Sequence, residues 1–279
     1  MRKLIFILAI LLATSAIAQQ RWGRGGSWGR DDIAWGRGVE QVLWTPLNVR
    51  GWSHLFIASP ANCGVGVGAN CPSWLELMLS GNNAFQGTGA DQPKLIQVGN
   101  KYALEFDGGN EFMTVHGNDT AGEFTYFTIL RTSESGASNR NNLYGHSTIG
   151  IYTGSFTFNV NVNEAWLNMK YSGTNRSLYS NVKPEVPSPN TVQIYLIYVA
   201  GAAGGNRPND RVYKNGVTVS PFFIDNTATN IAWGNLLLCR SNAWYGKLDI
   251  FEFGVYPGAM PESDRKQLEA YSKRTYGSP

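Results

Sequence analysis

Residues 247–256 read Lys-Leu-Asp-Ile-Phe-Glu-Phe-Gly-Val-Tyr and decide the fold class of this chain. Apolar and aromatic residues fill most of the stretch, which is typical of a strand buried in a sandwich. A helix is expected shortly after it, over residues 261–276. Acidic residues lie in its first turn and basic residues in its last, as the helix dipole favours, and Gly277 is a usual helix stop.

Short strands are expected along most of the chain before this stretch. Asn215-Gly216 is a strong hairpin signal between two short strands, and Gly108-Gly109-Asn110 predicts a second hairpin between residues 102–107 and 111–116. The other expected strands are 124–130, 149–152, 155–162, 165–171, 191–200 and 235–240. Many short strands with one late helix predict an all-β fold: a two-sheet antiparallel jelly-roll sandwich with one short C-terminal helix.

The N-terminus predicts secretion. Arg2-Lys3, an apolar run and the small-residue site Ala16-Ile17-Ala18 form a signal peptide over residues 1–18. The apolar run is too short to span a bilayer, so no transmembrane segment is expected. Removing the peptide leaves 23 − 2 = 21 basic residues against 20 acidic ones. This near balance argues against a nucleic-acid partner.

Residues 19–42 form a separate segment with a threefold Trp-Gly-Arg repeat. Glycine and arginine dominate it without any strand or helix period, which predicts a flexible tail before a domain over residues 43–279. The tail is either a partner-binding peptide or a linker. In the first case its binding residues are Trp22, Arg24, Trp28, Arg30, Trp35 and Arg37.

Several motifs follow one another in an order that resembles a known superfamily. These are Trp74, Ser80-Gly81-Asn82, Gln92-Pro93, the run 104–108, the run 211–216, the closing strand 252–256 and the helix end 271–277. Over roughly residues 44–277 the chain resembles the laminin-G-like, concanavalin A-like lectin and glucanase jelly rolls. The resemblance implies a fold that usually presents sugar-binding or adhesive surfaces. The motifs of this superfamily are mostly structural. The resemblance therefore implies turns and core positions in this chain, but it implies no binding site.

The resemblance also allows a test for glycosidase chemistry. Glucanases of this fold use a Glu-x-Asp-x-x-Glu strand, and retaining hydrolysis needs one carboxylate as nucleophile and another as acid. Here Lys247 stands at the nucleophile position, before Asp249 and Glu252. Because an ammonium group cannot form the glycosyl ester, we expect the chain not to be an enzyme.

The candidate ligand-binding residues come from long polar segments and from single aromatic residues. Residues 131–148, 171–190 and 201–210 are expected to be long loops, which are often functional. Sugars need an aromatic face with amide and arginine partners. The candidates are Tyr144, His146, Trp166, Tyr171, Asn175, Arg207, Trp233 and Trp244. For the tryptophans the alternative is a place in the sandwich core.

Two further features concern cofactors and cysteines. Asp107, Asn110 and Asp119 are candidate calcium ligands, with Asx-turn capping as the alternative, and no other cofactor is expected. Cys63 and Cys71 flank a glycine-rich loop, and a disulfide between them would contribute roughly 2–3 kcal/mol in an oxidising compartment.

These observations favour a secreted, extracellular, non-catalytic protein that recognises a glycan or a surface. The alternative is a structural or assembly subunit of an extracellular filament, a cell-surface layer or a virus particle. In that case the Trp-Gly-Arg tail is the assembly peptide that joins a neighbouring subunit.

Overall fold

The computed structural model describes residues 44–78, 81–115, 124–132, 141–147, 155–160, 165–171, 174–180, 191–199, 211–219, 222–223, 235–241 and 244–279. The compact unit runs from Trp44 to Pro279. The predicted signal peptide and the Trp-Gly-Arg tail lie outside the described residues. Within the described residues, no helix is long and apolar enough to cross a membrane.

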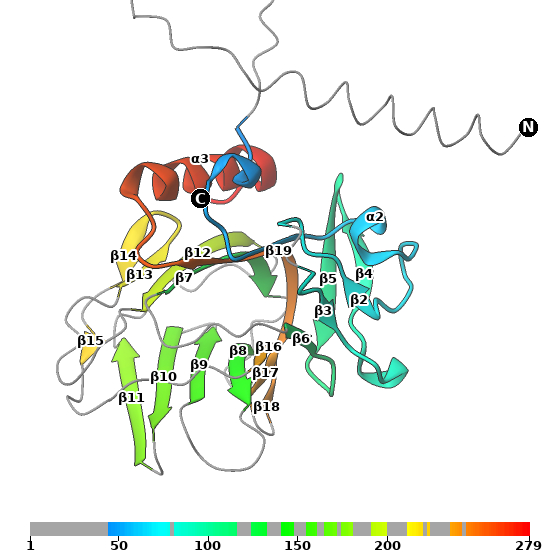
Figure 1. Ribbon diagram of the computed structural model, residues 1–279, viewed down its shortest axis with the longest axis horizontal. Helices are drawn as coiled ribbons and strands as arrows, with labels where there is room; N and C mark the ends of the chain where they lie inside the picture. The colour runs from blue at the N-terminus through cyan, green and yellow to red at the C-terminus, as the bar shows by residue number, and fades with distance from the viewer. Residues whose placement is uncertain are drawn as a thin grey trace, which may run out of the picture. The chain divides into compact units, whose positions relative to one another are not determined.

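The described strands form two large antiparallel sheets, which confirms the predicted sandwich (Figure 1). Sheet A has the order β14 (Val217–Val219), β13 (Arg211–Lys214), β12 (Val192–Val199), β7 (Phe124–Thr132), β19 (Lys247–Pro257), β5 (Lys101–Asp107) and β4 (Lys94–Val98), with β1 (His54–Ile57) also paired to β19. Sheet B has the order β15 (Phe222–Phe223), β11 (Thr174–Ser180), β10 (Ala165–Tyr171), β9 (Ser155–Val160), β8 (Asn141–Ser147), β16 (Asn235–Leu238), β6 (Met113–Val115), β3 (Ala84–Phe85) and β2 (Ser73–Trp74). A small pair, β17 (Arg240–Ser241) and β18 (Trp244–Tyr245), completes the described strands.

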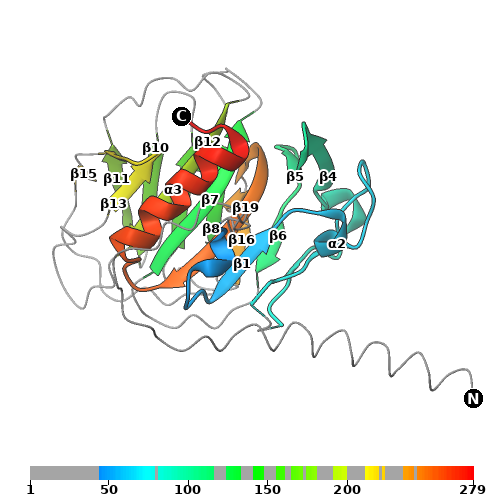
Figure 2. The same ribbon diagram turned by 90° about the horizontal axis from the view of Figure 1, so that it is seen from above.

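Sheet A carries an apolar cluster on each of its two faces. One face packs on sheet B, where Leu130 and Phe253 meet Met113 and Leu238 in one apolar cluster. The other face packs on helix α3 (Glu262–Tyr276), which lies across the strands in Figure 2. Phe127, Leu196, Phe251 and Leu268 share this second cluster. The nearly continuous apolar sequence of β19 follows from this, because both of its faces are covered.

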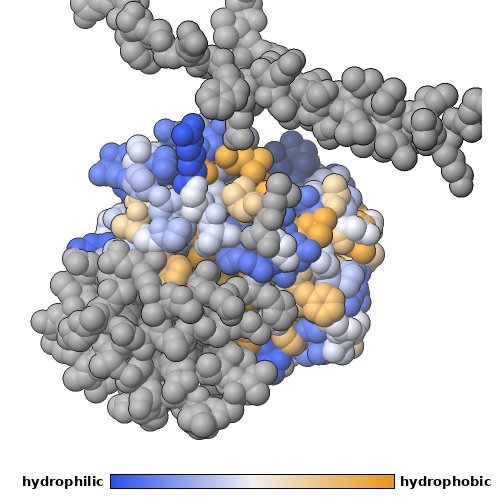
Figure 3. All heavy atoms as spheres, in the orientation of Figure 1, coloured by the Kyte–Doolittle hydropathy of each residue, from blue (hydrophilic) through white to orange (hydrophobic). Residues whose placement is uncertain are grey.

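Helix α3 ends where the sequence predicts. Gly277 adopts the left-handed conformation with φ 69°, and its N–H donates to the carbonyl of Lys273. The helix buries Leu268 and Tyr271 on sheet A and exposes charged residues such as Lys266 and Arg274. Hydrophilic side chains accordingly gather over α3 in Figure 3.

One predicted hairpin is confirmed and one is wrong. Asn215 and Gly216 have positive φ values of 50° and 83°, as a tight turn between β13 and β14 requires. By contrast, β5 belongs to sheet A and β6 to sheet B, so the strands around Gly108 do not pair with each other. The chain crosses between the sheets here, and local alternation of apolar residues looks the same in a crossing as in a hairpin.

The segment around the first two cysteines contains an unpredicted helical turn, α2 (Pro60–Cys63), whose N-cap Ser59 accepts a hydrogen bond from the Asn62 N–H. The predicted Cys63–Cys71 disulfide is not formed. Both residues are buried free thiols, and the Cys71 thiol donates to the carbonyl of Ser73 at 3.2 Å. Cys239 is also a buried free thiol, and it adopts a positive φ of 63° between β16 and β17.

Candidate functional site

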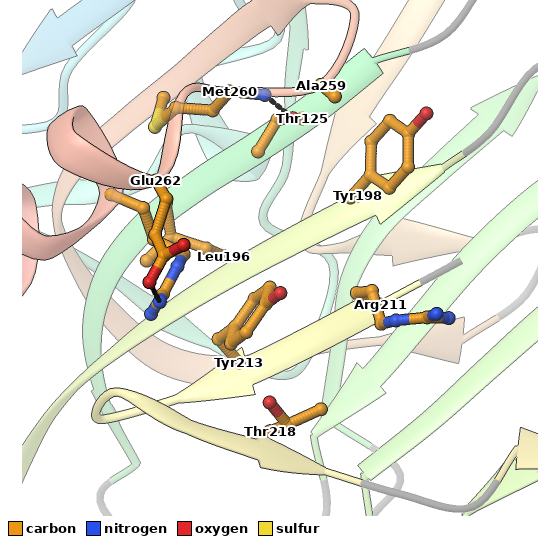
Figure 4. A pocket seen from close by; sticks show the side chains of 10 residues that line it. Thr125, Leu196, Tyr198, Arg211, Tyr213, Thr218, Ala259, Met260 and Glu262 are labelled. Atoms are coloured by element: carbon orange, nitrogen blue, oxygen red, sulfur yellow. Dashed lines mark hydrogen bonds and ion pairs between the residues drawn. The ribbon is translucent and has the colours of Figure 1, made fainter. Parts of the chain in front are cut away.

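A pocket of about 490 Å³ opens on the helix side of sheet A, beside the first turn of α3 (Figure 4). The strands β7, β12, β13 and β14 form its floor, and α3 with the segment before it forms the walls. Its lining residues are Thr125, Leu196, Tyr198, Arg211, Tyr213, Thr218, Ala259, Met260, Glu262 and Arg265.

Strand register explains why the floor residues meet. Tyr198 is paired with Arg211 on one side and with Thr125 on the other. Tyr213 is paired with Leu196 and with Thr218. Directly paired residues share a face of the sheet. Two tyrosines, an arginine and two threonine hydroxyls therefore gather on one small area.

The segment that leads into α3 is held to the floor of the pocket by a threonine. The Thr125 hydroxyl donates to the carbonyl of Gly258 at 2.8 Å and accepts from the N–H of Met260 at 3.1 Å. These bonds attach the turn between β19 and α3 to sheet A. The thioether of Met260 thereby stands at the edge of the pocket, as Figure 4 shows.

The charges of the α3 wall are compensated within the wall. The Arg265 guanidinium lies 4.2 Å from the centre of the Tyr213 ring, 2.5 Å from Glu269 and 3.7 Å from Glu262. Glu262 also pairs with Lys266 at 2.7 Å, which lowers the pKa of the Glu262 carboxyl. The pocket thus offers aromatic rings, hydroxyls and paired charges. This donor set suits an uncharged ligand rich in hydroxyl groups.

The predicted site residues fall mostly on sheet B, and three of them on strands instead of loops. Tyr144 and His146 belong to β8, and Asn175 belongs to β11. Tyr144 is paired with Leu238 and His146 with Leu236. Both leucines are in the core between the sheets. These two candidates therefore occupy positions on the core face of sheet B.

Trp166 and Asn175 occupy the opposite face of the same sheet. Tyr144 is paired with Phe158, and Phe158 is paired with Leu167. Leu167 thus continues the core row, and its neighbour Trp166 falls on the outer face because successive residues alternate. Asn175 is paired with Lys170 and shares the outer face, whereas Tyr171 shares the face of Leu167. Trp244 lies on β18, and Arg207 and Trp233 lie outside the described residues.

The described calcium candidates already have protein partners. The Asp107 carboxylate accepts from the Gly109 N–H at 2.7 Å, which closes an Asx turn. The Asn110 amide donates to the Asp91 carboxylate. Asp119 lies outside the described residues. In the part of the chain that the structure describes, no three His, Cys, Asp or Glu residues are placed to hold a metal ion.

The two carboxylates of the glucanase-like strand are buried in structural contacts. The Asp249 carboxylate forms an ion pair with the Arg131 guanidinium, with 2.5 Å between Oδ2 and Nε. Glu252 is fully buried and accepts from the hydroxyls of Tyr271 at 2.6 Å and Tyr276 at 2.5 Å. These contacts join β19 to β7 and to α3, and they leave neither carboxylate in the pocket.

No protein-family model matches the chain, and no curated protein matches its sequence. Solved structures do match. The binding domain of Paraclostridial mosquitocidal protein 1 is 12% identical, with a TM-score of 0.51, over 73% of this chain and 52% of that chain. Domain 4 of an extracellular arabinanase from Geobacillus stearothermophilus, solved in complex with arabinotriose, is 12% identical, with a TM-score of 0.51, over 78% of this chain and 98% of that chain.

A sialidase of Trypanosoma rangeli is also similar, at 12% identity and a TM-score of 0.52, over 83% of this chain and 34% of that chain. The chain therefore spans about half of the toxin domain and about a third of the sialidase. At this identity the likeness shows the fold alone, and the shared fold is a β-sandwich.

Sequence reasoning did not find the pocket. Tyr198, Arg211 and Tyr213 lie in segments that read as ordinary strands, and Glu262 and Arg265 read as an ordinary helix start. A local clue exists in retrospect: Tyr198 and Tyr213 are aromatic residues in strands next to the Asn215-Gly216 hairpin. Only the position of α3 on sheet A turns them into a pocket.

Proposed function

We propose that the protein is a secreted, non-catalytic glycan-recognition protein and that the pocket beside α3 binds a saccharide. One observation carries the proposal: Tyr198, Tyr213, Arg211 and Thr218 line one pocket of about 490 Å³. Aromatic rings offer flat apolar surfaces to sugar rings, and the polar groups at their edges can fix hydroxyl groups. The paired charges of the α3 wall favour a neutral ligand over a phosphate-rich one.

The similar solved structures support a binding role in general. One is named as the binding domain of a toxin and another was solved with arabinotriose. Secretion rests on the signal peptide predicted over residues 1–18. The absence of catalysis rests on Lys247 at the nucleophile position and on the structural use of Asp249 and Glu252.

The assembly-subunit alternative rests on a different observation, the Trp-Gly-Arg tail. A repeated indole and guanidinium pattern suits shallow pockets on a neighbouring subunit. The two functions differ in a simple measurement. A glycan-binding protein needs only its folded domain, whereas an assembly subunit needs residues 19–42 to associate.

The test is affinity electrophoresis in native gels that contain arabinan, xylan, galactomannan or mixed-linkage β-glucan. We expect at least one of these polysaccharides to retard the protein. The double variant Tyr198→Ala, Arg211→Ala should bind at least tenfold more weakly, a loss of about 1.4 kcal/mol. Arg50→Ala is the matched control, because Arg50 is exposed and lies outside the pocket. Failure of all four polysaccharides, or equal retardation of the double variant, would refute the proposal.

A further inference from the structure

Strand β3 of sheet B carries an exposed phenylalanine on the face that turns away from the core. The core row at this end of the sheet is paired in register and belongs to one apolar cluster: Trp74, Ala84, Val115 and Leu236. Phe85 follows Ala84 and therefore falls on the opposite face, because side chains alternate along a strand. Phe85 is 49% exposed, so this face is open to solvent at that position.

The Phe85 ring lies along its own strand, over a glycine. A Cβ on Gly87 would lie 3.2 Å from Cε1 and 3.4 Å from Cζ of Phe85. Any larger residue at position 87 would therefore press on the ring. The absence of a side chain at Gly87 lets the ring lie against the backbone with its other face toward solvent.

Hydroxyl groups flank the ring on both neighbouring strands. Phe85 is paired with Ser73 of β2 on one side and with Thr114 of β6 on the other. Directly paired residues share a face of the sheet, with Cβ atoms about 4.5–5.5 Å apart. Each hydroxyl can both donate and accept a hydrogen bond. We call Ser73, Phe85, Gly87 and Thr114 the Phe85 platform.

A second aromatic residue continues the same face beside the platform. Phe112 lies two residues before Thr114 and so shares its face of the sheet. Phe112 is half-buried, and the Arg240 guanidinium lies 4.5 Å from the centre of its ring. The platform and this pair together contain one charged group, the guanidinium of Arg240.

The size and the charge of the platform select its ligand. An aromatic side chain buries about 150–250 Å² in full, so the half-exposed Phe85 offers roughly 100 Å². A stable protein interface needs about 800 Å² from each partner, and a nucleic acid or an anionic membrane needs several basic groups. The residues of the platform supply neither. One flat ring between two hydroxyls matches a single uncharged sugar ring, with C–H groups against the aromatic face and hydroxyls at its edges.

We propose that the Phe85 platform is a second binding site, which takes one sugar ring of a neutral polysaccharide. Strands β3 and β6 lie far from β13 and β14, which belong to the floor of the pocket, in Figure 1. The two sites have no residue in common. The proposal shares its ligand class with the proposed function but rests on other residues, so the two can fail separately.

The experiment repeats the polysaccharide gels with variants of the full chain. Phe85→Ala removes the ring, and we expect it to weaken retardation roughly tenfold. Gly87→Ala keeps the ring but places a methyl group 3.2 Å from it, so the ring must move and retardation should also fall. Gly89→Ala is the matched control, because a Cβ there meets no atom within 4 Å.

Two further variants test whether the effect belongs to the ring. Leu47→Ala is the control for the loss of an exposed apolar side chain, because Leu47 is 54% exposed and lies in the turn Pro46–Asn48, outside the platform. Phe85→Tyr keeps the ring and should bind as wild type does. All of these positions are at the surface, so we expect melting temperatures to change by no more than a few degrees.

The outcomes separate the platform from the pocket. Weaker binding by Phe85→Ala and Gly87→Ala, with normal binding by both controls and by Phe85→Tyr, supports the platform whatever the pocket variant shows. Normal binding by either platform variant overturns the platform, and a loss in the pocket variant then still supports the pocket. A comparable loss in either control also overturns the platform. If none of the four polysaccharides retards the wild type, both sites are refuted.

Discussion

The buried carboxyl group of Glu252 predicts how stability depends on pH. Glu252 is fully buried on β19, and its Oε1 accepts from the hydroxyls of Tyr271 and Tyr276. Burial outweighs these two hydrogen bonds and raises the pKa of Glu252 from 4.5 to about 7. The perturbation is Glu252→Gln, which keeps the shape and the acceptor oxygen but cannot ionise.

The sign follows from proton linkage. Between its unfolded pKa of 4.5 and its folded pKa of about 7, Glu252 is protonated in the folded protein and ionised in the unfolded chain. Unfolding therefore releases a proton, so this group stabilises the fold fully below the unfolded value and loses that contribution as pH rises through the folded value. At 1.36 kcal/mol per pKa unit the full contribution is roughly 3 kcal/mol, of which roughly 2–3 kcal/mol is lost between about pH 5 and about pH 8.

The assay measures the free energy of unfolding of wild type and Glu252→Gln in urea at several pH values. The dependence of that free energy on urea concentration must be the same in both proteins, so that only stability differs. The free-energy difference between the two proteins should shift by roughly 2–3 kcal/mol in favour of the variant from about pH 5 to about pH 8. Burial also raises the pKa of Glu111 to about 7. Because both proteins contain Glu111, its contribution cancels when they are compared at each pH. A constant difference across this range would refute a raised pKa at Glu252.

Two further predictions concern packing and the tail. Gly254→Ala should cost about 1–3 kcal/mol through overpacking, because a Cβ there would lie 2.8 Å from Cζ3 of Trp52 and 3.2 Å from the carbonyl oxygen of His54. Thermal unfolding checks this against Gly66→Ala, where a Cβ meets no atom within 4 Å and no loss is expected. Replacing the three tail tryptophans with alanine should change the melting temperature by only a few degrees and sharply reduce self-association or surface attachment, as light scattering and binding assays would show. Unfolding of that variant would place the tail in the core, and normal association would make it a spacer. The substitutions are Trp22→Ala, Trp28→Ala and Trp35→Ala.

The pocket on sheet A and the strands of sheet B both depend on pairing between distant segments, which the local sequence does not determine. Residues 141–147 and 174–180 contain many polar residues and were expected to be loops, yet they form β8 and β11. Each of these strands has a neighbouring strand on both sides that pairs with its backbone. The local sequence gives no sign of this pairing. The side of the sheet on which Trp166 falls likewise follows from register with β9 and β8, since a shift of one residue would reverse it.

The sequence by itself determined the elements whose causes are local. The apolar run of β19, the turn at Asn215 and Gly216, and the charged ends and glycine stop of α3 were all readable, because propensity, turn geometry and the helix dipole act over a few residues. The tertiary structure alone decided that β5 and β6 join different sheets and that Arg265 of α3 lies over Tyr213 of β13. The physical reason is burial. Sheet A has apolar residues on both faces, and these are covered by sheet B on one face and by α3 on the other. Both contacts join segments that are far apart in the sequence.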